Sequence, residues 1–222
     1  MWAKDSEGLH NLFRLSSLAS YEGYYMKPRM DRELMGQYSG GIIASTGCPS
    51  GEVQTRLRLG QFEEACQAAS DYRDIFGREN YFCELMDHGV PIEKQVRSDL
   101  LKLAKKLDIP LLVTNDSHYV TEDQADAHDS LLCVGVGRNK DDPNRFRFNG
   151  SGYYIKSSEQ MRALFPDHPE ACDNTLLLTE MIGSYDEVFK YVDRMPQFDV
   201  PEGETQESWP VSYTHLTLPT IC

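Results

Sequence analysis

The chain has 222 residues, of which 40% are hydrophobic and 26% charged, a composition typical of a globular protein with its own core. Its net charge of -13 argues against a chain whose main surface grips nucleic acid, because such surfaces concentrate Lys and Arg. No apolar run approaches the roughly 20 residues that span a bilayer, and the first ten residues lack a signal-peptide layout, so we expect a cytoplasmic protein without membrane contact.

Helical and strand patterns alternate in the first half of the chain. Residues 6–21 carry apolar residues, Phe13 among them, at helical spacing behind Asp5 or Ser6 as a candidate N-cap. The β-branched run at 41–46 ends at Gly-Cys-Pro, which predicts a short buried strand. Further helices are predicted over 31–38, from residue 50 or 51 to 59, and over 61–76.

The same alternation continues in the second half. The run at 80–86 predicts a strand that ends at Asp87-His88-Gly89, which we interpret as a turn. Residues 91–107 show the clearest helical stripe of Ile, Val and Leu. Strands are predicted over 110–115 and 152–157, and helices over 122–133, 158–165 and 169–182.

Strands that alternate with helices indicate an α/β fold with a largely parallel sheet or a (β/α) barrel. Beyond Gly183 the pattern weakens, and the stretch from 193 to 208 looks like a connecting segment. The last stretch, 210–222, has no helix caps and resembles the translation of a sequencing adapter, so we expect it not to be native.

The cysteines carry no pairing signal. They are widely spaced and form no CxxC pair, so we expect reduced thiols that mostly face the core. The six are Cys48, Cys66, Cys83, Cys133, Cys172 and Cys222.

The carboxyl ends of parallel strands converge on one face, and ligand-type residues follow all three predicted strands. Asp87 and His88 follow the second strand, although a turn is their simplest interpretation. Asp116 and His118 come after the third strand, and residues i and i+2 on an extended segment point the same way. They could share a metal ion as oxygen and nitrogen donors, a set that suits Zn²⁺ or Mn²⁺. Cys48, after the first strand, would add a thiolate.

Simpler interpretations remain open for each of these residues. Asp116 could cap a turn, His118 could lie on the surface, and Cys48 could be a small core residue. His128, on an acidic helix, is expected to face solvent. No nucleophile elbow, P-loop or GxGxxG motif is present, so neither a serine triad nor a nucleotide cradle is predicted, and we name no catalytic residue.

Several long segments resemble the PHP (polymerase and histidinol phosphatase) domain of the alpha subunits of bacterial DNA polymerase III, most strongly the actinobacterial form. They are "GLHNLFRLSSLASYEGYYMKPRMD", "GIIASTGCPSGEV", "ELMDHGVPIEKQ", "PLLVTNDSHYVTEDQADAHDSLLCVGVGRNKDDPNRFRF" and "GYYIKSSEQMRALFP…ACDNTLLLTEMI", in this order. The resemblance runs from about Gly8 to about Glu207. It implies that 1–185 is the C-terminal part of a distorted (β/α)7 barrel, truncated at its first strands, and that 186–209 leads toward a polymerase palm.

The resemblance also implies a function. Cys48, Asp116 and His118 fall on ligands of a metal cluster that holds Zn²⁺ or Mn²⁺ and serves a 3′–5′ exonuclease that proofreads. The intact subunit would be a DNA-directed DNA polymerase that uses Mg²⁺, primer–template DNA and deoxynucleoside triphosphates and binds replisome subunits such as the sliding clamp. Since the family's early His-x-His ligands are absent, the fragment itself is expected to be inactive. The alternative is a non-catalytic scaffold that braces the polymerase and docks replisome subunits.

Overall fold

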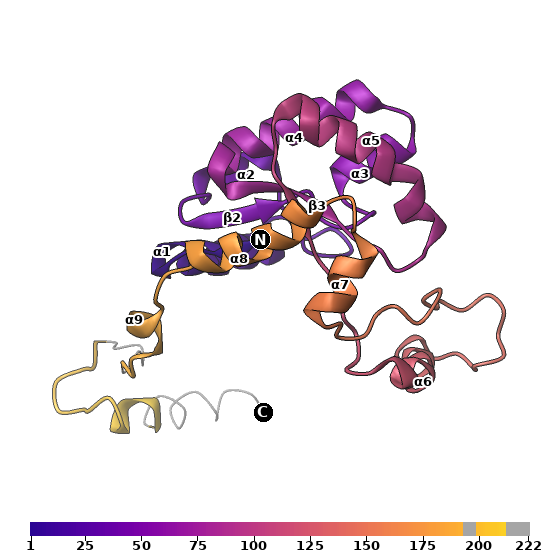
Figure 1. Cartoon of the computed structure of the whole chain (residues 1–222). Helices are drawn as coiled ribbons and strands as arrows, with labels where there is room; N and C mark the ends of the chain where they lie inside the picture. Colours follow the sequence, from indigo (N-terminus) through magenta and orange to yellow (C-terminus); the bar gives the residue numbers. More distant parts are fainter. Residues whose placement is uncertain (193–198, 212–222) are drawn as a thin grey trace. The chain divides into compact units, whose positions relative to one another are not determined.

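The computed structural model describes residues 1–192 and 199–211. By its contacts the chain divides into two units, Met1–Tyr185 and Asp186–Cys222. The first unit holds the sheet and the helices that pack on it (Figure 1). The described part of the second unit includes the short helix α9 (Asp186–Phe189).

The boundary after Tyr185 falls where the predicted PHP segment ends, although the assignment of each segment to a domain stays a prediction. The predicted connecting segment 186–209 is described only in part. Of the tail that we expect not to be native, residues 212–222 lie outside the described residues.

The described residues form a four-stranded sheet in the order β1-β2-β3-β4. β1 (Trp2–Ala3) is antiparallel to β2 (Ile42–Ser45). β3 (Tyr81–Leu85) and β4 (Leu111–Val113) continue the sheet in parallel, so β2, β3 and β4 point their carboxyl ends the same way. This is the α/β arrangement expected for part of a (β/α) barrel, and the predicted fold class is confirmed.

Helices connect the parallel strands, and most of them match the predicted ranges. Asp5 caps the first helix by accepting a hydrogen bond from the Gly8 N–H at 2.9 Å, as predicted. The remaining bounds are α1 (Ser6–Tyr21), α2 (Arg32–Gln37), α3 (Glu52–Arg58), α4 (Phe62–Phe76), η1 (Arg78–Asn80), α5 (Pro91–Leu107), η2 (Glu122–Gln124), α6 (Ala125–Val136), α7 (Ser158–Leu164) and α8 (Pro169–Met181).

Both faces of the parallel strands are covered, as their near-continuous apolar sequence indicates. On one face, alternate strand residues such as Cys83 pack into a large cluster with side chains of α3, α4 and α5. On the other face, Ile43, Phe82 and Leu112 form a smaller cluster with Leu178 of α8. The period of two along each strand decides which face a side chain joins.

Two predictions about individual segments were wrong. Phe13 is 54% exposed, because the buried stripe of α1 runs through Gly8, Asn11 and other residues instead. The predicted strand at 152–157 is reduced, among the described residues, to an isolated parallel bridge between Tyr119 and Tyr154. The segment pairs with residues 118–120, which lie beyond the end of β4 and do not form a strand of the sheet.

Among the helices in the described part of the chain, none is both long and apolar enough to cross a membrane.

Candidate metal centre

A buried carboxyl group joins the ends of the three parallel strands. Glu84, on β3, is 7% exposed and faces the same side as Phe82. Ser45, at the end of β2, donates its hydroxyl to one carboxyl oxygen, and Thr114, directly after β4, donates to the other at 2.5 Å. We did not single out Glu84 from the sequence. The available signal was a lone acid inside an apolar strand, which requires partners when it is buried.

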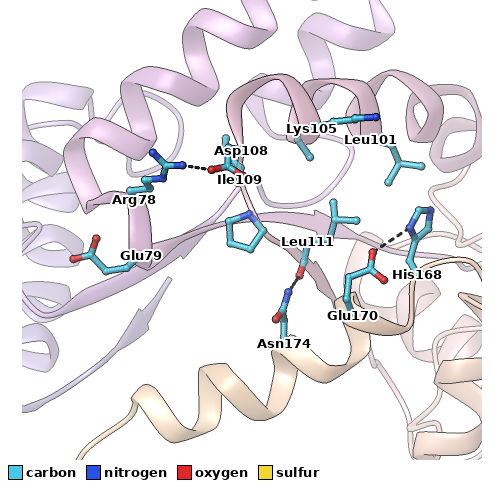
Figure 2. Close-up of a pocket in the computed structure, with 12 residues that line it drawn as sticks. Arg78, Glu79, Leu101, Lys105, Asp108, Ile109, Leu111, His168, Glu170 and Asn174 are labelled. Atoms are coloured by element: carbon cyan, nitrogen blue, oxygen red, sulfur yellow. Dashed lines mark hydrogen bonds and ion pairs between the residues drawn. The ribbon is translucent and has the colours of Figure 1, made fainter.

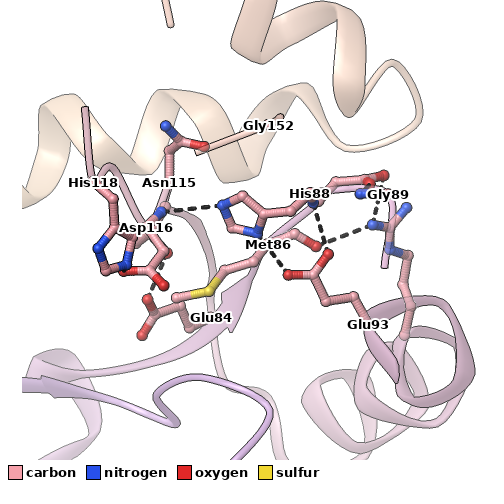
Figure 3. A network of polar contacts seen from close by, with 12 residues as sticks. Glu84, Met86, His88, Gly89, Glu93, Asn115, Asp116, His118 and Gly152 are labelled. Atoms are coloured by element: carbon pink, nitrogen blue, oxygen red, sulfur yellow. Dashed lines mark hydrogen bonds and ion pairs between the residues drawn. The ribbon is translucent and has the colours of Figure 1, made fainter. Parts of the chain in front are cut away.

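Asp116 and His118 lie together beyond the end of β4, as their spacing predicts. Asp116 Oδ1 is 3.3 Å from His118 Nε2 (Figure 3). Half of the Asp116 side chain and a third of the His118 side chain are exposed to solvent. The pair therefore presents a carboxylate oxygen and an imidazole nitrogen side by side at an accessible edge.

The backbone that carries the pair is fixed by hydrogen bonds. The Asp116 N–H donates to Nε2 of His88 over 3.3 Å. The His118 N–H donates to the Tyr153 carbonyl over 2.7 Å. Two accessible side chains are thus attached to an anchored main chain, an arrangement suited to holding a ligand in defined geometry.

His88, which the sequence led us to interpret as part of a turn, forms a buried pair with Glu93. Its side chain is 1% exposed, and that of Glu93, in the first turn of α5, is 6% exposed. His88 Nδ1 lies 2.6 Å from Glu93 Oε1, and the His88 backbone N–H donates to Glu93 Oε2 over 2.7 Å (Figure 3). The segment does turn, as predicted, with Gly89 at φ 76°. The turn also carries a buried histidine–carboxylate pair.

Aromatic rings surround the imidazole of His118. Its ring centroid lies 4.6 Å from that of Phe148 and 5.2 Å from that of His128. His128 is half-buried and also contacts Tyr119 and Phe148. The expectation that His128 simply faces solvent was therefore wrong, because the loop after α6 folds back and covers the ring on one side.

Cys48 is exposed, so the interpretation of this residue as a small core residue was wrong. It lies in the turn after β2, where the Gly51 N–H donates to its carbonyl at 2.8 Å. Its role as a ligand stays a prediction. Among the described residues, no group of three or more His, Cys, Asp or Glu side chains is arranged to hold a metal ion. Since Zn²⁺ takes about four donors, the Asp116–His118 pair fits part of a coordination sphere and does not complete one.

The described cysteines differ in exposure, so we expect two classes of thiol reactivity. Cys48 is exposed, whereas Cys66, Cys83, Cys133 and Cys172 are buried. Burial raises the pKa of the Cys83 thiol to about 12, which removes the reactive thiolate at neutral pH.

We expect an alkylating reagent at pH 8 to modify Cys48 at least about tenfold faster than Cys83. Mass spectrometry of the two cysteine peptides, compared with the urea-unfolded chain, measures this ratio. Equal rates in the native chain would contradict the burial of Cys83.

Charged groups next to the candidate centre are held by partners. Burial by itself would raise the pKa of Asp87, but hydrogen bonds from Arg97 and from the Gly89 N–H outweigh it and lower that pKa. Burial lowers the pKa of Lys156, whose ammonium group donates to Asn115 Oδ1 at 3.0 Å. The turn before α5 and the segment after β4 are therefore each fixed by a charged side chain.

A surface hollow of about 840 Å³ lies at the opposite, amino end of β4. Figure 2 shows that residues of α5, β4 and α8 line it, with Asn174 donating to the Leu111 carbonyl at 2.7 Å. Charges on its rim pair with each other, as Arg78 does with Asp108. This hollow is separate from the candidate metal centre.

Comparison with known proteins gives a consistent assignment. Residues 1–88 match the PHP domain family. The chain is 57% identical over 221 residues to the DNA polymerase III subunit alpha of Saccharopolyspora erythraea, a match that covers 99% of this chain and 18% of the relative. It is 56% identical over 211 residues to the subunit alpha of Mycobacterium tuberculosis, covering 94% of this chain and 18% of the relative.

The similarity extends to distant bacteria. The DNA polymerase III subunit alpha of Thermus aquaticus is 36% identical over 225 residues, covering 97% of this chain and again 18% of the relative. This chain thus spans about a fifth of the length of the relatives that it matches. The chain belongs to the DNA polymerase III subunit alpha family, of which it represents a segment, and residues 1–88 of this segment match the PHP domain.

Proposed function

We propose that this chain is the part of a replicative DNA polymerase subunit in which Asp116 and His118 are two ligands of a divalent metal ion, Zn²⁺ or Mn²⁺, in a 3′–5′ exonuclease site. The observation that carries the proposal is the 3.3 Å approach of Asp116 Oδ1 to His118 Nε2 at the accessible carboxyl edge of the parallel strands. Carboxylate and imidazole are donors that suit both metals. Cys48, in the turn after β2, is proposed as a third ligand from its place in the sequence.

The surroundings of the Asp116–His118 pair favour a ligand-binding site over a chance contact between two side chains. An ion pair between exposed side chains usually contributes little to stability, so stability alone does not explain it. Here the main chain of both residues is anchored by buried groups, while the side chains remain open to solvent. Anchoring of this kind is what a ligand site requires, since ligands must be held close to their productive geometry.

The whole subunit is proposed to synthesise DNA from deoxynucleoside triphosphates on a primer–template, with Mg²⁺ and with replisome partners such as the sliding clamp. This proposal rests on the relatives described above, which carry the name DNA polymerase III subunit alpha. The chain spans 18% of those proteins, so these activities belong to the complete subunit.

A non-catalytic scaffold is the second candidate. One observation favours it: in the described part of the chain no three potential ligands converge on one point. In that case the Asp116–His118 pair would stabilise only the loop that carries it, and the domain would brace the polymerase or dock other subunits.

Replacing Asp116 by Asn in the full-length subunit separates the two candidates. If Asp116 is a ligand, we expect Mn²⁺-dependent removal of a mismatched 3′ nucleotide to fall by at least about tenfold, while primer extension on matched DNA is unchanged. The neutral amide keeps the size of the side chain and removes its charge.

Asp123→Asn is the matched control, because Asp123 is an exposed acid in η2 of the same loop region. It should leave the nuclease rate unchanged. A wild-type subunit without nuclease activity, or an Asp116→Asn variant with the wild-type rate, would contradict the exonuclease proposal and favour the scaffold.

A further inference from the structure

Two residues whose rings stack on each other, His88 and Tyr153, hold the segment from Asp116 to His118. The imidazole of His88 lies on the ring of Tyr153 with centroids 4.4 Å apart and an interplanar angle of 6°. His88 Nε2 accepts the Asp116 N–H, and the Tyr153 carbonyl accepts the His118 N–H. Each end of the segment is thus fixed by one member of the stack.

The segment that carries Tyr153 lies close to the backbone of His88. Gly152 passes so close to His88 that a Cβ at this position would lie 3.3 Å from the His88 Cα (Figure 3). Even an alanine at position 152 would require the two segments to move apart by a few tenths of an ångström. The absence of a side chain at Gly152 thus favours the close approach of the two loops.

Glu93 decides which nitrogen of His88 carries the proton. Because Nε2 accepts the Asp116 N–H, the ring proton belongs on Nδ1, 2.6 Å from Glu93 Oε1. The second carboxylate oxygen accepts the His88 backbone N–H at 2.7 Å. A carboxylate offers two acceptors and no donor, so it stabilises only this tautomer.

We infer that His88 is a positioning residue for Asp116 and His118, and that Glu93 acts on the pair by holding His88 in its Nδ1–H tautomer. His88 acts through the backbone of Asp116 and through Tyr153. The functional meaning of this role rests on the proposed function of the Asp116–His118 pair. The positioning itself needs no metal ion, so it can be tested apart from the nuclease.

The first test uses the unaltered chain. A long-range ¹H–¹⁵N correlation spectrum of the metal-free protein should show His88 with a protonated Nδ1 and an unprotonated Nε2 at neutral pH. The opposite tautomer would overturn the inference, because Nε2–H cannot accept a hydrogen bond from Asp116. This result does not depend on any variant folding.

The second test is Glu93→Gln, which keeps the size of the side chain. Its amide oxygen must accept the His88 backbone N–H, so its NH₂ group faces Nδ1 and favours the other tautomer. The Asp116 N–H then meets a donor. We expect its hydrogen exchange to become roughly three- to tenfold faster, as for the loss of one hydrogen bond.

Asp87→Asn is the matched control, because Asp87 holds the same turn to α5 through Arg97 at 2.7 Å without contacting Asp116. Exchange at Asp116 should be unchanged in this variant. The Thr114 N–H, bonded to the Leu85 carbonyl, reports whether the end of the sheet stays intact. Unchanged exchange at Asp116 in Glu93→Gln, with the Thr114 signal intact, would overturn the role of Glu93.

Discussion

Replacing Glu93 by Ala is expected to lower the free energy of unfolding of the chain by about 3 to 6 kcal/mol, the largest stability effect that we predict. Glu93 accepts two hydrogen bonds in a buried place, one from the His88 ring and one from its backbone. Each bond to a charged group contributes roughly 1.5 to 3 kcal/mol, and its loss leaves a buried donor without a partner. Urea unfolding followed by circular dichroism measures the difference.

Gln95→Ala is the matched control on the same helix, because Gln95 is exposed. Its effect should stay within about 0.5 kcal/mol, as is usual for surface substitutions. If Glu93→Ala were no more destabilising than this control, the buried pair with His88 would not exist in solution.

Apolar patterns typical of strands alternate with patterns typical of helices along the sequence, and this alternation was sufficient to predict the α/β fold and most element bounds. Parallel strands and their helices depend on local apolar patterns, and the stripe of 91–107 matches α5 at both ends. The shortest elements could not be predicted in this way. β1 has two residues, and its strand character comes from pairing with Ile43 and Ile42 far along the chain.

The candidate site was predictable only where its members are close in sequence. Asp116 and His118 lie together because residues two apart on an extended segment share a side. Cys48 was grouped with them on the argument that strand ends converge. In the register of the sheet, Ser45 at the end of β2 lies opposite Phe82, and β3 continues to Leu85. The turn after β2 therefore begins before the level at which β3 ends.

The buried polar contacts were not predictable, since each depends on packing between separate elements. His88 and Glu93 are only five residues apart, but they meet because α5 begins directly against the turn. Glu84 finds its hydroxyl partners at the carboxyl ends of two other strands, Ser45 at the end of β2 and Thr114 directly after β4. Period and composition give the face of a side chain and do not give its partner across the sheet.

Thr114 provides the sharpest test of the Glu84 contact, because two substitutions separate its hydroxyl from its shape. Thr114→Val keeps the size of the side chain and removes the donor to Glu84, which is buried on β3. We expect the free energy of unfolding to fall by about 1.5 to 3 kcal/mol, the contribution of one hydrogen bond to a charged acceptor. Thr114→Ser keeps the donor and loses one methyl group, so it should cost only about 1 kcal/mol. Urea unfolding of both variants measures the difference between them. The bond from Thr114 to Glu84 would be refuted if Val were tolerated as well as Ser.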